Sequence, residues 1–255
     1  MVYIIGAGPG DPELITVKGL RLLQETDVVI YAGSLVNPAL LEHCKKGVEI
    51  HNSASMDLEE VLAVIERAVG EGKTVVRLHT GDPALYGAIQ EQMDALEEKK
   101  IAYTVVPGVS SFFAAAAAVP HELTLPGITQ TVILTRMEGR TPVPEREKLA
   151  SLAAHRTTMC IFLSVQQIKD VAQELIAGGY PPETSVVVVE KASWPGQQIV
   201  QGNLSNIAPK VTEAGITKTA LIMVGDVFSG PYERSKLYDP CFSHGCREAK
   251  KPEGK

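Results

Sequence analysis

The sequence contains little that would suit it to a membrane or to an oxidising compartment. Its longest apolar stretch, around 112–119, is far shorter than the roughly 18 residues that cross a bilayer. The N-terminus lacks a basic region followed by a long apolar one, so we see no signal peptide. Four cysteines among 255 residues show no disulfide framework. We therefore expect a cytoplasmic protein that does not contact membranes.

Positive charge is also scarce. The chain carries 24 Lys and Arg against 30 Asp and Glu, a net charge of −6, and has no basic stripe. This balance argues against non-specific binding to nucleic acid and against an enzyme that acts on ribosomal RNA. It leaves room for an acidic small molecule, which needs only a local cluster of Lys and Arg. With 45% apolar and 21% charged residues, the chain can form a packed core.

The cysteines do not indicate a metal site. Cys241 and Cys246 flank His244 in a polar segment near the C-terminus, without CxxC spacing. We expect no metal ion there, and the sequence assigns these two cysteines no role. Cys160 lies in the apolar run 159–162 and is predicted to be a buried small hydrophobic residue.

The first half of the chain alternates predicted strands and helices. Strands are expected at 2–5, 27–31, 48–50, 74–79 and 103–106. Between the third and fourth, Asp57 and Glu60 have the spacing of a capping box. An apolar stripe at helical spacing follows over 58–69. This alternation predicts an α/β fold, with helices packed on a largely parallel sheet.

The second half of the chain begins after a break at 120–127, which contains two prolines and a glycine. Strands are predicted at 131–135, 158–163, 185–190, 197–201 and 219–224, and helices at 165–177 and 204–212. The sequence Trp194-Pro195-Gly196 is typical of a hairpin turn between two strands. We predict an N-terminal α/β domain over 1–119, a C-terminal α/β domain over 120–232 and a polar tail over 233–255.

The first predicted strand leads into a glycine-rich turn, residues 6–11, which is easily mistaken for a dinucleotide-binding fingerprint. Glycine has no Cβ, so such a turn can let a ligand approach the backbone. Asp11 stands where the third glycine of the dinucleotide pattern belongs, and Pro9 has no N–H for a phosphate. No acidic residue ends the second strand to hold a ribose hydroxyl. These absences argue against an NAD-dependent oxidoreductase.

Small residues in tight turns follow four of the predicted strands, at 6–11, 31–36, 79–87 and 107–111. Ligands of open α/β sheets bind beyond the carboxyl ends of the strands. Glycine and proline punctuate any α/β loop, but four such turns at one edge of a sheet predict a ligand site there.

These turns also carry a family resemblance. The segment 5–19 resembles the first signature of the tetrapyrrole-modifying methyltransferases that use S-adenosylmethionine. The segment 75–108, with Gly81-Asp82 and Pro107-Gly108, resembles their second signature, in the right order and at the right separation. The resemblance covers residues 1 to about 230. Within the family, the segments 31–36, 135–144 and 237–245 resemble the branch that methylates C11 of precorrin-4.

The resemblance implies a fold and an activity. The fold is that of the class III S-adenosylmethionine-dependent methyltransferases: two α/β domains with mostly parallel or mixed sheets, an active site in the cleft between them, and a homodimer. The activity is methylation of C11 of precorrin-4, or of its cobalt form, to the corresponding precorrin-5 in cobalamin biosynthesis. The sequence does not decide whether the substrate carries cobalt, although the overall resemblance favours the cobalt form.

The resemblance also implies a set of cofactor contacts. They are Pro9, Thr80, Gly81, Asp82, Leu85, Ser110, Ser111, Leu163, Ala192, Thr219 and Ala220. Asp82 is a candidate acceptor for the amino group or the ribose of the cofactor. The alternative is that Asp82 caps the turn before Pro83, since Asp is a preferred capping residue.

Candidates for catalysis and substrate binding are fewer. Tyr31, Ser34 and His79 are candidates for a base only because they stand at strand ends, where a lone His is more often structural. The carboxylates of a tetrapyrrole need cationic partners. We expect Arg136, Arg140 and Lys18 to contribute them. The alternative for the loop 136–146 is solvated surface charge.

Two other functions stay open. One is methylation of a different precorrin carbon or of uroporphyrinogen III. The uroporphyrinogen-III enzymes typically carry an Asp after the Tyr, where this chain has Ala32. The other is a non-catalytic tetrapyrrole carrier, which would not need S-adenosylmethionine.

Overall fold

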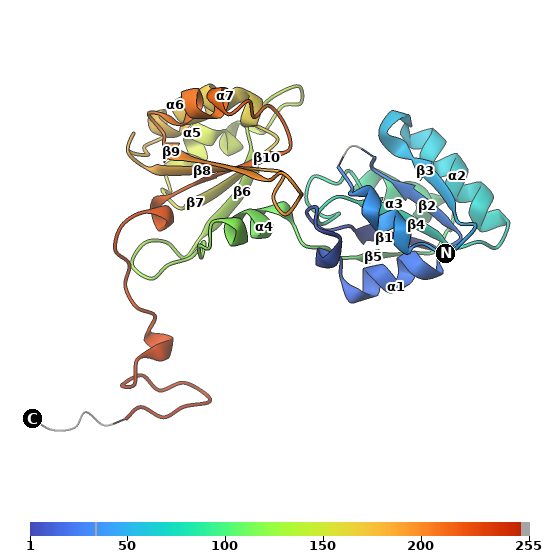
Figure 1. Cartoon of the computed structure of the whole chain (residues 1–255), viewed down its shortest axis with the longest axis horizontal. Helices are drawn as coiled ribbons and strands as arrows, with labels where there is room; N and C mark the ends of the chain where they lie inside the picture. The colour runs from blue at the N-terminus through green and yellow to red at the C-terminus, as the bar shows by residue number, and fades with distance from the viewer. Residues whose placement is uncertain (34, 251–255) are drawn as a thin grey trace, which may run out of the picture. The chain divides into compact units, whose positions relative to one another are not determined.

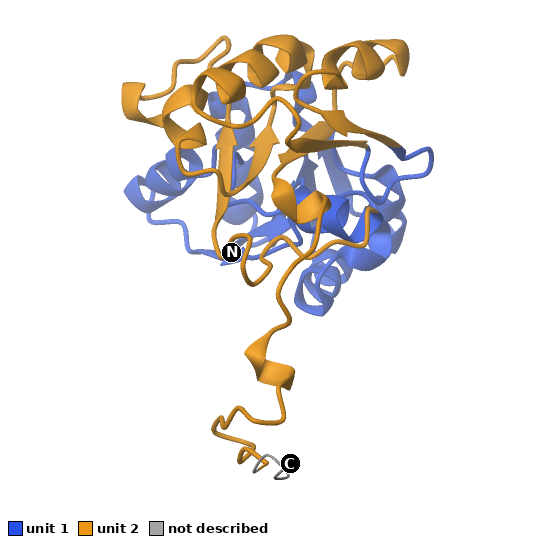
Figure 2. Ribbon diagram, turned by 90° about the vertical axis from the view of Figure 1, so that its left-hand side faces the viewer, with its two compact units in different colours: residues 1–118, 191–198 blue, residues 119–190, 199–255 orange. Residues whose placement is uncertain are grey.

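The computed structural model describes residues 1–33 and 35–250. The chain divides into two compact units, coloured separately in Figure 2. The first comprises residues 1–118 and 191–198, and the second comprises 119–190 and the chain from 199 onward. Each unit has its own five-stranded sheet (Figure 1) and is described by itself.

The first unit is a parallel α/β structure. Its sheet has the order β3-β2-β4-β1-β5, and every pairing is parallel. The strands are β1 (Val2–Gly6), β2 (Val28–Tyr31), β3 (Glu49–Asn52), β4 (Val75–His79) and β5 (Tyr103–Val106). The helices are α1 (Val17–Glu25), α2 (Leu58–Gly70), α3 (Gln90–Glu98) and α4 (Ser111–Ala118), with short 3-10 turns η1 (Pro12–Leu14), η2 (Pro38–His43) and η3 (Ser53–Ser55).

Helices cover both faces of this sheet, which explains why its central strands read as continuous apolar runs. Successive side chains of a strand point to opposite faces. Ile4 packs in a cluster with Leu62 and Ile65 of α2, whereas its neighbour Ile5 packs in a second cluster with Leu23 of α1. The carboxyl ends of all five strands therefore share one edge, between two helical layers.

The second unit has a mixed sheet of order β6-β7-β10-β8-β9. Strands β6 (Val132–Arg136) and β7 (Thr158–Phe162) are parallel, and β10 (Ala220–Val224) is antiparallel to both β7 and β8 (Ser185–Glu190). The last strand is β9 (Gln198–Asn203). Helices α5 (Leu149–Ala153), α6 (Ile168–Ala177) and α7 (Ile207–Glu213) gather over one face (Figure 1). The 3-10 turns are η4 (Glu145–Glu147), η5 (Val165–Gln167), η6 (Asp226–Phe228) and η7 (Lys236–Tyr238).

The predicted α/β class with parallel or mixed sheets is confirmed, and the predicted strands lie within two residues of the observed ones. The capping box is present: Glu60 N–H donates to Asp57 Oδ1 (2.8 Å) and Asp57 N–H donates to Glu60 Oε2 (2.9 Å). The helix predicted over 204–212 starts three residues late, at Ile207. The helix predicted over 165–177 begins as the 3-10 turn η5.

The connection between β8 and β9 differs in one respect from the sequence prediction. The two strands are neighbours, as a hairpin turn at 194–196 requires. Residues 191–198, which lie within the predicted second domain, belong to the first unit. Among the described residues, no helix is long and apolar enough to span a bilayer.

Candidate active site

Three loops interlock at the carboxyl edge of the first sheet. Gly81 N–H donates to the Gly8 carbonyl (2.8 Å), and Gly8 N–H donates back to the Gly81 carbonyl (3.3 Å). A Cβ on Gly108 would lie 2.2 Å from the Gly81 carbonyl oxygen and 2.7 Å from Gly6 Cα. The turns after β1, β4 and β5 are therefore in backbone contact, so the prediction that they meet at one edge is confirmed.

The glycines of the first turn are used for packing inside the protein. A Cβ on Gly6 would lie 2.5 Å from Gly108 Cα, and one on Gly10 would lie 2.0 Å from Trp194 Cδ1. At Gly8, φ is +80° and the Leu14 carbonyl oxygen would be 2.9 Å away. Protein atoms therefore occupy the space that the missing side chains leave, which agrees with the expectation that this turn does not serve a pyrophosphate.

Asp82 holds the loop after β4 through both carboxylate oxygens. Its Oδ1 accepts from Ala84 N–H (2.8 Å), and its Oδ2 accepts from Gly108 N–H (2.9 Å). The first bond is the turn cap that was the alternative to a cofactor contact, and the second ties this loop to the one after β5. Asp82 therefore has a structural role whether or not it also contacts a ligand.

Three hydroxyl groups stand beside this junction. Thr80 and Ser111 are half-buried and Ser110 is buried. Their hydroxyls form no hydrogen bond within residues 1–33 and 35–250. Ser111 is the first residue of α4, where backbone N–H groups have no partner inside the helix. Of the other positions predicted to contact the cofactor, Gly81 and Pro9 are buried and Leu85 is half-buried. The first unit therefore brings Thr80, Gly81, Asp82, Ser110 and Ser111 to one edge.

Of the four remaining predicted cofactor positions, two have a strained backbone. Leu163 (φ 55°) and Thr219 (φ 53°) have positive φ, and Lys191 (φ 48°) and Ser193 (φ 68°) flank the buried Ala192. Such a conformation costs a non-glycine residue about 1–3 kcal/mol and gathers at functional sites. Leu163 is 72% exposed at the end of β7, so packing within the second unit does not account for it. Ala220 opens β10 beside Thr219.

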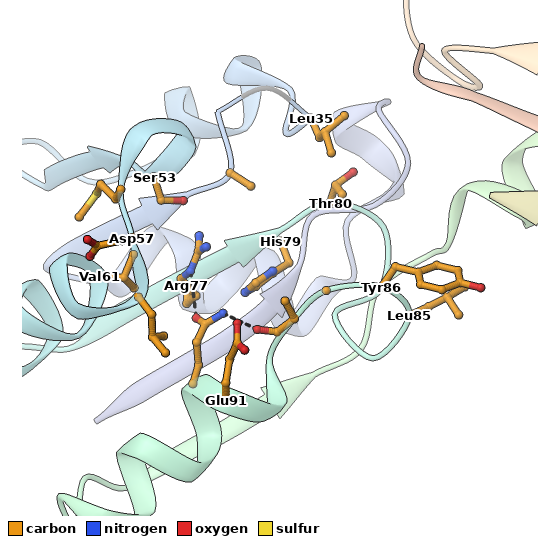
Figure 3. Close-up of a pocket in the computed structure, with 16 residues that line it drawn as sticks. Leu35, Ser53, Asp57, Val61, Arg77, His79, Thr80, Leu85, Tyr86 and Glu91 are labelled. Atoms are coloured by element: carbon orange, nitrogen blue, oxygen red, sulfur yellow. Dashed lines mark hydrogen bonds between the residues drawn. The ribbon is translucent and has the colours of Figure 1, made fainter. Parts of the chain in front are cut away.

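A pocket of about 290 Å³ opens over the face of the first sheet, between α2 and the loop 85–88 (Figure 3). The pocket is lined by residues of β4 and the loop after it, namely Arg77, His79 and Thr80. Other lining residues include Leu35, Val61, Leu85 and Tyr86. Tyr86 (φ 56°) and Ala88 (φ 47°), both in the lining, add two more strained residues.

His79 is disfavoured as the base by its surroundings. It is 5% exposed. Burial, and then the nearby charge of Arg77, lower the pKa of His79 to about 3. An imidazole with that pKa accepts a proton poorly near neutral pH. Tyr31 is half-buried at the end of β2, and its backbone carbonyl accepts from the Ser53 hydroxyl (3.1 Å). Ser34 lies outside the described residues.

The three residues predicted to bind the substrate differ in whether their side chains are already engaged within the protein. Arg136 donates to the backbone carbonyls of Met137, Thr141 and Pro142, at 3.4, 3.1 and 2.7 Å. The guanidinium therefore holds together the loop that carries it, and this structural role explains an arginine at position 136 without a substrate carboxylate. Arg140 and Lys18 are exposed. A role for these three residues in substrate binding stays a prediction.

Cys160 is buried in β7, as predicted, and burial raises the pKa of its thiol to about 12. Cys241 and Cys246 are exposed. Within the part of the chain that the structure describes, no group of three or more His, Cys, Asp or Glu residues is placed to hold a metal ion.

Sequence reasoning missed Arg77, Ser193 and Trp194. Arg77 is a charged residue inside an apolar strand that is buried along its length. That pattern was a readable signal, because such a charge needs a partner. The contacts of residues 193 and 194 with the first turn join segments more than 180 residues apart and leave no local signal.

Comparison with known proteins decides the family. The model of the tetrapyrrole (corrin/porphyrin) methylases matches residues 1–208. The chain belongs to this family. One tetrapyrrole methylase, the cobalt-precorrin-4 C(11)-methyltransferase of Methanocaldococcus jannaschii, is 58% identical over 251 residues, which are 98% of this chain and 97% of that protein.

Two solved structures of tetrapyrrole methylases extend the comparison. One, described as the cobalamin biosynthetic enzyme cobalt-precorrin-4 methyltransferase, has a TM-score of 0.88 and 52% identity, covering 90% of this chain and 96% of that one. The other is uroporphyrin-III C-methyltransferase from Thermus thermophilus complexed with S-adenosylhomocysteine. It has a TM-score of 0.74 and 30% identity, covering 89% of this chain and 92% of that one.

Proposed function

We propose that this protein is an S-adenosylmethionine-dependent C-methyltransferase that methylates C11 of cobalt-precorrin-4 to give cobalt-precorrin-5 in cobalamin biosynthesis. The observation that carries the proposal is 58% identity, over nearly the whole of both chains, with a cobalt-precorrin-4 C(11)-methyltransferase. A solved structure of the same description is 52% identical. Both descriptions name the cobalt form, which supports cobalt-precorrin-4 over its metal-free counterpart.

The residues at the carboxyl edge of the first sheet suit S-adenosylmethionine. This cofactor presents an amino group, a carboxylate and ribose hydroxyls, and it has no pyrophosphate. Thr80, Ser110 and Ser111 offer hydroxyls, and the N-terminus of α4 offers backbone N–H donors with the positive end of the helix dipole. The turn 6–11, whose backbone is packed against protein, matches the lack of a phosphate to bind.

The chain's part in the reaction is then alignment. The bound cofactor supplies a methyl group already activated on a sulfonium sulfur. The residues of the site hold the ring carbon in line with that group, which removes much of the entropic barrier. Leu163 and Thr219 are proposed as further cofactor contacts, because their strained backbones hold side chains at the ends of β7 and β10. The electron density at C11 comes from the conjugated pyrrole nitrogen, and no residue is assigned as the base.

A second candidate function is methylation of uroporphyrinogen III, supported by the 30% identical Thermus thermophilus structure. The higher identity with the cobalt-precorrin-4 enzyme favours the first function. We also propose that the protein is a homodimer, as the family resemblance implies. Sedimentation at several concentrations gives its mass directly.

Isothermal titration calorimetry with S-adenosylhomocysteine tests whether the protein binds this cofactor. Micromolar binding that S-adenosylmethionine displaces supports the proposal, whereas no heat and no competition contradict it and favour a carrier. Arg21→Gln is a suitable control, because Arg21 is exposed on α1 and, within the described residues, pairs with Glu25 alone. Parallel assays with cobalt-precorrin-4, metal-free precorrin-4 and uroporphyrinogen III then rank the substrates.

A further inference from the structure

Arg77 brings a positive charge into the interior of the first unit. Its side chain is 7% exposed, on a strand whose other residues are buried. Its Nε donates to Gln92 Oε1 and its Nη1 donates to the Ile30 carbonyl, both at 3.2 Å. Among the described residues, no carboxylate lies within ion-pair distance of it. Burial lowers the pKa of Arg77 to about 10, so the group is still charged at neutral pH.

His79 lies two residues further along β4, so its side chain is on the same face of the sheet as Arg77. Figure 3 shows the guanidinium and the imidazole next to each other in the pocket. The Nε2 atom of His79 is buried, and within the described part of the chain it has no hydrogen-bond partner. A buried charge without a counterion and a buried polar atom without a partner are both unfavourable. Both would be satisfied by one anionic group.

The walls of the pocket narrow the choice of ligand. Much of the lining is apolar, from Leu35, Met56, Leu58, Val61 and Leu85. Its remaining charged residues are Asp57, whose Oδ1 accepts from Glu60 N–H, and the exposed Glu91. Among the described residues of the lining, Arg77 is thus the single permanent positive charge. The carboxylates of Asp57 and Glu91 would repel any further negative charge in the pocket, so the lining suits a ligand group with one negative charge that reaches Arg77.

We propose that the pocket of Arg77 and His79 binds one carboxylate arm of the tetrapyrrole, with the methylene groups of the arm against the apolar wall. The carboxylate would accept from the guanidinium and from the N–H of a neutral imidazole. At about 290 Å³, the pocket is at the small end of ligand sites, which suits an acetate or propionate arm and not a whole macrocycle. The assignment rests on the proposed function, and it names an anchor other than Arg136.

The test compares affinities for uroporphyrin III, a stable tetrapyrrole with acetate and propionate arms, by the fluorescence of the porphyrin. Wild type is compared with Arg77→Gln, Arg77→Lys and His79→Phe, with Arg21→Gln as the matched control. We expect the Kd to rise roughly 10- to 100-fold in Arg77→Gln, as the loss of a charge-assisted hydrogen bond predicts. A smaller rise is expected in Arg77→Lys, which keeps the charge and loses the two-pronged geometry.

Two further measurements separate ligand binding from structural support. His79→Phe removes a nitrogen that has no hydrogen-bond partner among the described residues, so it is expected to weaken uroporphyrin binding without lowering the melting temperature. The octamethyl ester of uroporphyrin III lacks carboxylates, so its affinity is expected to be equal in wild type and Arg77→Gln. If Arg77→Gln does not fold, Arg77→Lys and His79→Phe decide the question.

Equal uroporphyrin affinity in wild type, Arg77→Lys and His79→Phe, including no binding by any of them, would overturn the assignment of the pocket. Loss of affinity for the ester in parallel with the acid would overturn it as well. The titration with S-adenosylhomocysteine is read separately. A wild type that binds uroporphyrin through Arg77 but does not bind S-adenosylhomocysteine contradicts the methyltransferase proposal and leaves the pocket supported.

Discussion

The indole N–H of Trp194 donates a 2.9 Å hydrogen bond to the backbone carbonyl of Pro9, 185 residues earlier in the chain. The Trp194 ring also fills the space beside Gly10 that a Cβ would need. Next to it, the Ser193 hydroxyl accepts a 3.0 Å hydrogen bond from Asp11 N–H. Two consecutive residues of the segment 191–198 therefore hold the turn after β1.

Gly10→Ala is expected to destabilise the protein by about 1–3 kcal/mol, the usual cost of overpacking. The new methyl group would meet Trp194 Cδ1 at 2.0 Å. In a Trp194→Ala background the same change is expected to cost less, because the obstructing ring is gone and only the strain of the positive φ of Gly10 (+159°) remains. Urea unfolding of the two single variants and the double variant gives the coupling free energy. Additive costs would show that the ring does not constrain this turn.

Gly108→Ala is expected to be more severe, with a loss above about 3 kcal/mol or no folded protein. Its Cβ would lie 2.2 Å from the Gly81 carbonyl oxygen, a backbone atom that cannot rotate away. Gly70→Ala at the end of α2 is the matched control, since among the described residues nothing beyond its chain neighbours and the helix backbone lies within 4 Å of the added Cβ. That change is expected to stabilise by about 0.5–1 kcal/mol. A mild effect at Gly108 on the melting temperature would contradict the interlocked arrangement.

Asp82→Ala and Asp82→Asn are both expected to lower the free energy of unfolding, by about 1–2 kcal/mol. Alanine loses both carboxylate acceptors. Asparagine has one acceptor oxygen, so it cannot serve Ala84 N–H and Gly108 N–H from separate oxygens. Chemical denaturation measures the loss, and calorimetry with S-adenosylhomocysteine measures affinity in the same variants. Unchanged stability with weakened affinity would instead indicate that Asp82 acts through the cofactor alone.

Asp27→Asn is expected to lower the melting temperature at pH 7 by about 2–4 °C. The Asp27 carboxylate accepts from Lys45 Nζ (2.6 Å), and from the N–H (2.8 Å) and hydroxyl (2.9 Å) of Thr74 just before β4. The hydrogen bond from Lys45 and those from Thr74 lower the pKa of Asp27 from 3.8 to about 2.

The sign of the pH dependence follows from that depressed pKa. The stabilisation is fully present above the ordinary value of 3.8 and is lost as the pH falls through the folded value of about 2. The difference in melting temperature between wild type and Asp27→Asn should therefore shrink as the pH is lowered from 4 to 2. Comparing the two proteins cancels the contribution of Glu49, whose pKa is also lowered to about 2, chiefly by Arg67 and His51. A constant difference would contradict the carboxylate's role.

The local features of the fold could be predicted from the sequence. The alternation of apolar runs and helical stripes predicted where the strands lie, and the spacing of Asp57 and Glu60 predicted where α2 begins. The parallel order of the first sheet then placed the turns after β1, β4 and β5 at one edge.

Contacts between distant segments could not be predicted. The glycines of the turn 6–11 show only that space is needed, and the structure shows that Trp194 and Gly108 take it. Likewise, Arg136 stands in a loop with two further arginines, and only its hydrogen bonds to three carbonyls show that its guanidinium is engaged there. Arg77 shows the opposite case. Its charge in an apolar strand was visible in the sequence. That its partners among the described residues are Gln92 and the Ile30 carbonyl, and not a carboxylate, was not.

Methyl transfer to cobalt-precorrin-4 tests the central claim most directly. The purified protein would be incubated with S-adenosylmethionine labelled with carbon-13 on the methyl group, and the labelled position in the product would be read by NMR. The account predicts one new methyl group, at C11, and S-adenosylhomocysteine in equal amount. A label at another carbon, or transfer to uroporphyrinogen III with none to cobalt-precorrin-4, would contradict it.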